Sequence, residues 1–286
     1  DPVLALVARY NFERLEASNI EVICTSAETF VAEFAGTADL IYADPARRDG
    51  ANRRLVRLEE CSPDVRSLMP RLRQIARRIV VKASPLFDTD EAFALFGGEV
   101  SVEAVSLHGE CKELLIDLPG TDRPEAPGLL RATAIGRGTR IFHPEQLRDG
   151  KPDAGFDPPY GFLLVPDVSL YKIRAARCYL QSAGAFAASE TGYGFARHLP
   201  DDFLGHAYPI EEIVPYRPKA LKTLFRTRGI ERLNLLKRDF PLDAEQIARA
   251  TGIRQGGNGM AAFTTVNGQR IAVILSEEGR ERGRRL

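Results

Sequence analysis

The chain has 286 residues, of which 44% are hydrophobic and 27% are charged, and its formal net charge is zero. This composition predicts a soluble globular protein of two or three domains and excludes a largely disordered chain. No apolar run approaches the roughly 18 residues that a membrane-spanning helix needs, so we expect no membrane partner.

Helical and strand-like patterns alternate over the first 118 residues. In chain order we expect a helix at 3–17, a strand at 19–24, a helix at 27–35, a strand at 38–43, a helix at 63–76, a strand at 78–82, a helix at 89–96, and strands at 100–107 and 112–118. This alternation is typical of a parallel, doubly wound sheet, and the turn at Gly109 makes the last two strands antiparallel. We therefore expect an α/β fold with a Rossmann-like domain over residues 1–118, whose ligands bind at the carboxyl ends of the strands.

The rest of the chain is expected to form smaller α+β units. Residues 119–159 are rich in Pro and Gly and indicate a connector with one or two strands near 131–142. A second unit, at 160–212, is expected to contain a strand at 162–166 and a helix at 170–182. The third unit, at 213–286, should follow with a strand at 211–216, a helix at 218–228, a strand at 232–237, a helix at 243–251, and strands at 260–266 and 270–275. Asn267-Gly268 predicts a hairpin between the last two strands.

Charge is distributed unevenly along the chain. From Ile213 to the end there are 15 Lys/Arg against 7 Asp/Glu, an excess of +8 that the rest of the chain balances. A basic unit on an acidic body predicts a polyanionic partner for this end of the chain. Within it, the Gly256–Gly259 run is either a simple turn or a loop that can approach a backbone phosphate.

The segment Asp44-Pro45-Ala46-Arg47-Arg48 directly follows a predicted buried strand. A plain turn, in which Asp44 caps the next helix, is one interpretation. A strand that ends in Asp-Pro-Ala-Arg also resembles the acceptor motif of class I S-adenosylmethionine-dependent methyltransferases, especially those that act on RNA. The resemblance implies that Asp44, with Pro45 and Arg47, forms the catalytic motif that positions the acceptor atom beside the methyl group.

Further segments are similar to those of one bacterial methyltransferase family. They are Glu59–Asp64, Lys82–Asp88, Gly109–Leu114 and Tyr208–Leu275, the last of which includes Lys237–Pro241 and Gly256–Asn258. The family has a ferredoxin-like middle domain and a C-terminal THUMP-like domain, and the resemblance extends over nearly the whole chain. It implies a ferredoxin-like domain at 160–212, a THUMP-like domain at 213–286 and S-adenosylmethionine as the cofactor.

The resemblance also implies where the cofactor binds. In relatives a glycine-rich loop and an acid that binds the ribose come before the segment matched here, so we expect both upstream of Asp1 and expect this chain alone to be inactive. The loop with Ser26, Ala27 and Glu28 is expected to contact the cofactor together with Asp44. The alternative for Ser26 is a helix cap.

Four residues near the acceptor motif are candidate substrate contacts. Arg47 and Arg48 form a basic loop that suits phosphate, and Lys82 and Ser84 end a neighbouring strand. The alternatives are a solvated loop and a solvated strand end.

Cysteine and histidine give weaker signals. Cys111 lies beside Lys112, which could lower the pKa of the thiol for nucleophilic catalysis, although packing is the alternative. The four Cys and four His show no metal-ligand spacing, so no metal is expected, and few cysteines in a long chain fit the cytoplasm.

These observations favour a methyltransferase that acts on RNA and holds its substrate with the basic C-terminal domain. The alternatives are a noncatalytic RNA-binding protein on a methyltransferase scaffold and a methyltransferase of proteins or small molecules.

Overall fold

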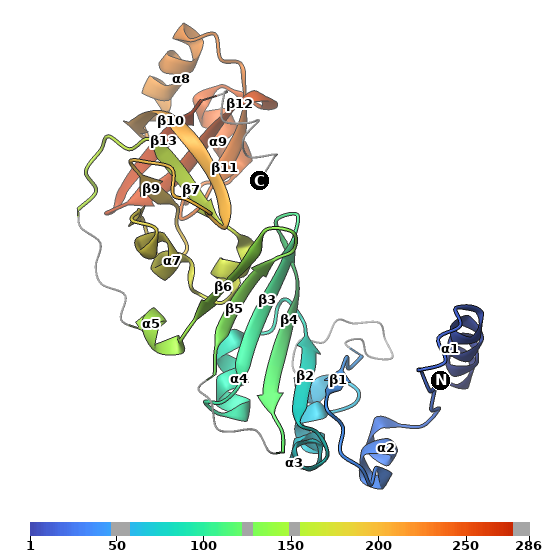
Figure 1. Ribbon diagram of the computed structural model, residues 1–286. Helices are drawn as coiled ribbons and strands as arrows, with labels where there is room; N and C mark the ends of the chain where they lie inside the picture. The colour runs from blue at the N-terminus through green and yellow to red at the C-terminus, as the bar shows by residue number, and fades with distance from the viewer. Residues whose placement is uncertain (47–57, 122–127, 149–154, 277–286) are drawn as a thin grey trace. The chain divides into compact units, whose positions relative to one another are not determined.

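The computed structural model describes residues 1–46, 58–121, 128–148 and 155–276 (Figure 1). The chain divides into two compact units. Unit 1 comprises Asp1–Phe87 and Asp117–Glu125, and unit 2 comprises Asp88–Ile116 and Ala126–Leu286. No helix among the described residues is long and apolar enough to span a membrane.

Unit 1 contains a short sheet and the helices that accompany it. Its elements are α1 (Pro2–Arg14), α2 (Ala27–Glu33), β1 (Ile41–Ala43), the 3-10 turn η1 (Leu58–Glu60), α3 (Val65–Ile75), β2 (Arg78–Ala83) and the last residues of β4 (Glu110–Pro119). The strand order is β1-β2-β4, and β1 runs parallel to β2. The predicted parallel pairing of the two strands is therefore confirmed, but the strand expected at 38–43 is shorter, Ile41–Ala43, and is not buried as predicted.

Burial of apolar side chains explains α3 and β2. Asp64 caps α3 by accepting hydrogen bonds from the backbone of Arg66 and Ser67. The buried face of the helix comprises Val65, Met69, Leu72 and Ile75. Arg71 on α3 donates hydrogen bonds to carbonyls of α2 and its C-terminal end, at 3.3 Å to Val31 and 2.8 Å to Phe34.

The prediction of a strand at 19–24 is wrong. These residues form no regular element, because no strand among the described residues pairs with them, and β-propensity without pairing does not make a strand. Arg9 of α1 contacts this segment, because its Nη2 atom donates a hydrogen bond to the carbonyl of Val22 at 2.9 Å. The helix α1 forms as predicted but buries none of its residues.

The first sheet of unit 2 includes strands that we expected in a connector. The elements are α4 (Thr89–Phe96), β3 (Ser101–Leu107), β4, β5 (Leu130–Ala134), β6 (Gly138–Phe142) and α5 (Pro144–Arg148). The strand order is β4-β3-β5-β6. β5 is parallel to β3 and antiparallel to β6, so the sheet is mixed and the predicted strands near 131–142 belong to it.

The second sheet of unit 2 has the order β11-β12-β13-β10-β7-β9-β8. Its strands are β7 (Phe162–Pro166), β8 (Phe186–Ala187), β9 (Gly194–Ala196), β10 (Gly205–Pro215), β11 (Arg232–Lys237), β12 (Arg254–Val266) and β13 (Gln269–Leu275). The accompanying helices are α6 (Val168–Lys172), α7 (Ala176–Ser182), α8 (Pro218–Thr227) and α9 (Ala244–Thr251). The single helix predicted at 170–182 is divided into α6 and α7, because Arg174 adopts a positive φ of 59° between them.

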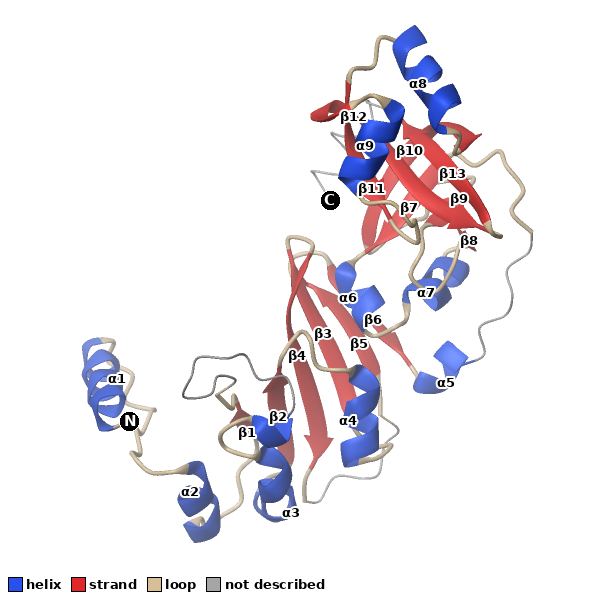
Figure 2. Cartoon of the chain, turned by 180° about the vertical axis from the view of Figure 1, so that it is seen from behind, coloured by secondary structure: helices blue, strands red, loops and turns tan. Residues whose placement is uncertain are grey.

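The helices α8 and α9 lie side by side against this second sheet (Figure 2). Leu221 and Phe225 of α8 and Ile247 of α9 pack with Phe263 and Ala272 of the sheet. A second core, which contains Leu163, Tyr193 and Phe195, packs on other residues of the same strands. The predicted Asn267-Gly268 hairpin is present, with φ of 49° and 77° at these residues. The chain therefore has a mixed α/β fold.

Candidate functional site

Asp44 lies directly after β1, at the carboxyl end of the strand. Its side chain is 45% exposed, whereas Pro45 is buried and restricts the backbone where the chain leaves the strand. Ala46 then exchanges two backbone hydrogen bonds with Ser62, at 2.8 and 3.3 Å. This short antiparallel bridge anchors the segment after Asp44, so the carboxylate stands at a fixed strand end and remains open to solvent.

Lys82 of β2 lies beside Asp44. Because Ala43 pairs with Val81 in the parallel register, the next residues of the two strands, Asp44 and Lys82, are neighbours. The Nζ atom of Lys82 forms an ion pair with Oδ2 of Asp44, and the lysine side chain is 20% exposed. A partly exposed pair of this kind contributes up to about 1 kcal/mol to stability. Its clearest effect is on geometry, because it orients the carboxylate at the end of β1.

Ser84 is brought to the same strand end, but its side chain is buried. Its Oγ accepts a hydrogen bond from the backbone of Leu86 at 3.2 Å, and its carbonyl accepts one from Phe87 at 2.9 Å. These bonds shape the turn after β2. The structure therefore gives Ser84 a role in holding the turn, which supports Lys82 from the C-terminal side.

The loop before α2 forms a helix cap. The Oγ atom of Ser26 accepts a hydrogen bond from the backbone of Thr29 at 3.1 Å and donates one to the Thr29 hydroxyl at 2.9 Å. Ala27 is half-buried, and Glu28 is exposed in the first turn of the helix. Within the described part of the chain, no hydrogen bond or ion pair joins these three residues to Asp44.

The remaining motif residues, Arg47 and Arg48, lie outside the described residues. The basic loop that we expected beside Asp44 therefore stays a prediction.

Cys111 has a different environment from the one that its sequence neighbours suggested. Lys112 forms an ion pair with Glu110, with an N···O distance of 2.6 Å. Burial raises the pKa of the Cys111 thiol, and the nearby charge of Lys172 opposes this rise. A nucleophilic cysteine needs its thiolate near neutral pH, so the environment favours a packing role for Cys111.

No group of His, Cys, Asp and Glu that could hold a metal ion occurs in residues 1–46, 58–121, 128–148 and 155–276.

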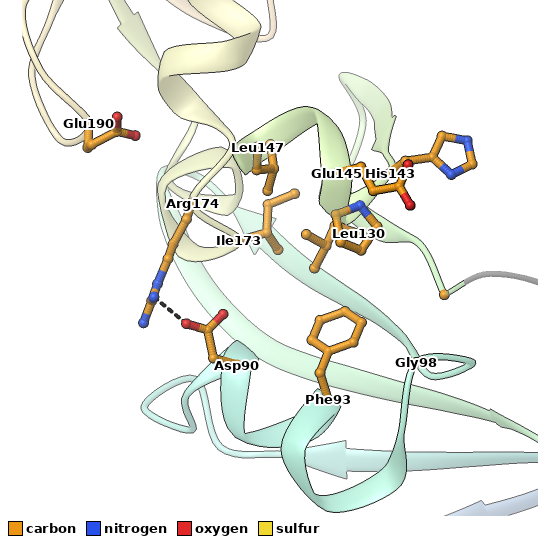
Figure 3. Close-up of a pocket in the computed structure, with 12 residues that line it drawn as sticks. Asp90, Phe93, Gly98, Leu130, His143, Glu145, Leu147, Ile173, Arg174 and Glu190 are labelled. Atoms are coloured by element: carbon orange, nitrogen blue, oxygen red, sulfur yellow. Dashed lines mark hydrogen bonds and ion pairs between the residues drawn. The ribbon is translucent and has the colours of Figure 1, made fainter. Parts of the chain in front are cut away.

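A cavity of about 730 Å³ lies within unit 2, between α4, α5 and the loop before α7 (Figure 3). Its apolar lining comprises Phe93, Leu130, Pro144, Leu147 and Ile173. At its rim, Arg174 pairs with Asp90 and, at 3.1 Å, with Asp88. No local sequence pattern indicates this cavity, because its lining comes from segments far apart in the sequence. The cavity contains none of the predicted site residues.

The C-terminal sheet contains an interruption in the pairing of β11 with β12. Arg232 pairs with Arg254 and Leu233 with Gln255, but the next pair joins Asn234 to Met260. Residues 256–259 are thus looped out of the ladder. The glycine run singled out in the sequence is a bulge in a long strand, and the simple turn that was its alternative does not occur.

Comparison with known proteins supports two parts of this description. Residues 205–277 match the family model "THUMP domain-like". The fold matches the crystal structure of a presumed methyltransferase from Porphyromonas gingivalis W83, with a TM-score of 0.72 and 24% sequence identity. The match covers 83% of this chain and 59% of that one, so this chain spans less than two thirds of that protein's length. No curated protein matches the sequence. Residues 205–277 therefore form a THUMP-like domain, and most of the chain shares its fold with the Porphyromonas protein.

Proposed function

We propose that the protein is an S-adenosylmethionine-dependent methyltransferase that acts on RNA, with Asp44 at its acceptor site. The observation that carries the proposal is the Asp44–Lys82 ion pair at the carboxyl ends of two parallel strands. In open α/β sheets, ligands bind outside this edge. The likeness in fold to a presumed methyltransferase supports the same reaction class.

Asp44 would orient the acceptor. Its exposed carboxylate can accept a hydrogen bond from an N–H group of a nucleobase and so hold the acceptor nitrogen in line for transfer. Lys82 is a positioning residue that fixes the carboxylate, and Pro45 restricts the turn beneath it. Arg47 would help to hold the substrate from the same segment. The cofactor, when bound, supplies the activated methyl group.

The residues proposed to contact the cofactor fit it in part. The hydroxyl of Ser26 already has its partner in Thr29. The backbone N–H groups of Ala27 and Glu28 belong to the first turn of α2, where no helical acceptor exists. They can donate to a ring nitrogen of adenine, and Asp44 would supply a carboxylate at the end of β1.

The THUMP-like domain and the charge distribution support RNA as the substrate. The excess of 15 Lys/Arg over 7 Asp/Glu from Ile213 onward gives this end of the chain the charge needed to hold a phosphate backbone. Arg47, Arg48 and Lys82 are the further substrate contacts that we propose beside Asp44. RNA affinity should fall steeply with salt and be lost when residues 213–286 are deleted, and unchanged affinity after the deletion would contradict this assignment.

Mass spectrometry of modified nucleosides in total RNA tests the proposal. A strain that lacks the gene should lose one methylated nucleoside, and the gene supplied on a plasmid should restore it. A nucleoside profile identical to that of the parent strain would contradict the proposal.

A further inference from the structure

Two arginines stand directly opposite each other in neighbouring strands of the THUMP-like domain. Arg232 of β11 and Arg254 of β12 are partners in the parallel ladder, so their side chains leave the same face of the sheet. Both are exposed. Like charges directly opposite each other destabilise a sheet, and no carboxylate among the described residues forms an ion pair with either arginine. Among the described residues, therefore, no ion pair neutralises the positive charge of these two arginines.

The bulge at 256–259 brings the main chain beside the arginine pair. Gly256 and Gly257 have φ of 101° and 85°, which favours glycine at both positions. The Nδ2 atom of Asn234 donates to the carbonyls of Gly257 at 2.8 Å and Gly259 at 3.3 Å, which holds the bulge in place. A Cβ atom on Gly257 would lie 2.9 Å from Cβ of Arg232. The backbone thus packs against the base of one arginine, and no side chain from Gly257 stands in the way of a ligand.

A third cation, Lys222, lies near the start of β12. The aliphatic stem of Lys222 on α8 passes over Gly252, where a Cβ atom would lie 3.1 to 3.5 Å from its three outer carbons. Gly252 precedes Arg254 by two residues. The nearest carboxylate in the sequence is Glu231, which lies before β11, and its backbone carbonyl accepts a hydrogen bond from the Arg254 N–H at 2.9 Å. Positive charge therefore predominates at this end of the two strands.

We propose that the arginine pair, with the bulge beside it, binds a phosphodiester of the RNA backbone. The planar guanidinium group of arginine can donate two hydrogen bonds to the oxygens of one phosphate. Two such groups on one face of the sheet can bind the same phosphate or two successive ones. A glycine bulge lets a sugar–phosphate chain come near without collision. The inference rests on the proposed function for the choice of RNA as the ligand, and it adds the place on the domain where the backbone is held.

Binding of a fluorescein-labelled RNA hairpin, followed by fluorescence anisotropy between about 50 and 200 mM KCl, tests the proposal. The variants are Arg232→Glu and Arg254→Glu in the full chain. Arg270→Glu is the matched control, since Arg270 is exposed, pairs with Thr265 near the other end of β12, and changes the net charge equally. Circular dichroism and thermal melts confirm that the variants fold.

Each variant of the pair should weaken binding about tenfold and reduce the slope of log Kd against log salt by roughly 1, the loss of one phosphate contact. Arg270→Glu should change affinity less than about threefold, as expected of an exposed charge remote from the site. Equal effects of all three variants would overturn the inference but leave the proposed function intact. Failure of the unaltered chain to bind RNA would overturn the inference together with the RNA assignment.

Discussion

Substitution of Lys82 by Met isolates the role of the Asp44–Lys82 ion pair. Met keeps most of the length of the lysine stem within β2, where the neighbouring Val81 and Ala83 are fully buried, so the strand should remain packed. The pair is partly exposed, with 20% and 45% of the two side chains accessible. Its loss should therefore cost at most about 1 kcal/mol and lower the melting temperature by no more than ~2–4 °C.

Catalysis should respond far more than stability. Without Lys82 the carboxylate of Asp44 loses its fixed orientation, and a misplacement of about 1 Å at a reacting group can slow a reaction roughly 100-fold. The assay is transfer of a labelled methyl group from S-adenosylmethionine to RNA by the full-length protein, with kcat and KM determined separately. We expect kcat to fall ~10- to 100-fold and the KM for the cofactor to change little.

Arg77→Met is the matched control for this substitution. Arg77 pairs with Asp39 at 3.0 Å, at the opposite ends of the same two strands, and both side chains are largely exposed. This variant removes one cation and one ion pair but should leave kcat unchanged. Transfer of methyl groups by Lys82→Met as fast as by the control would refute the positioning role of Lys82.

Further predictions concern stability and thiol chemistry. Gly128→Ala should destabilise the protein by about 2–3 kcal/mol in a chemical-denaturation experiment, because overpacking strains a close backbone contact, and here the added Cβ would lie 1.9 Å from the Val100 carbonyl oxygen. Gly136→Ala, at φ 79° with open space around it, should cost only about 1 kcal/mol. Iodoacetamide at pH 7.5 should modify the exposed Cys24 first, because burial raises the pKa of Cys111 and keeps its thiol protonated. Labelling of Cys111 should speed up only as the pH rises toward its raised pKa, and faster labelling of Cys111 than of Cys24 at pH 7.5 would contradict its assignment to packing.

Local patterns predicted many of the elements. The strands at 162–166 and 232–237 have the predicted bounds, and the Asn267-Gly268 hairpin forms because its two residues adopt positive φ readily. Patterns of this kind depend on residues that are adjacent in the sequence, so they can be recognised from the sequence alone.

Features that depend on distant partners could not be predicted in the same way. The segment at 19–24 has strand-forming residues, yet no described strand pairs with it. The pairings of β5 with β3 and of β9 with β7 arise from contacts between segments far apart in the sequence. The bulge at 256–259 requires the register of β11, which the glycines alone do not specify.

The candidate site divides in the same way into features that local patterns predict and features that they do not. A strand that ends at Asp44 and another that ends near Lys82 follow from hydrophobic patterns, and the parallel pairing of β1 with β2 brings the two residues together. The burial of Ser84 and the ion pair between Lys112 and Glu110 could not be anticipated, because they depend on side-chain geometry.

Genetic complementation tests the central claim, that Asp44 positions the acceptor of a methyl transfer, most directly. The strain that lacks the gene receives the full-length gene with Asp44→Ala or, as the matched control, with Asp39→Ala, which removes an exposed carboxylate at the other end of β1. Nucleosides of total RNA are then measured by mass spectrometry. The control should restore the missing methylated nucleoside, and Asp44→Ala should not. Restoration by Asp44→Ala at the level of the control would contradict the claim.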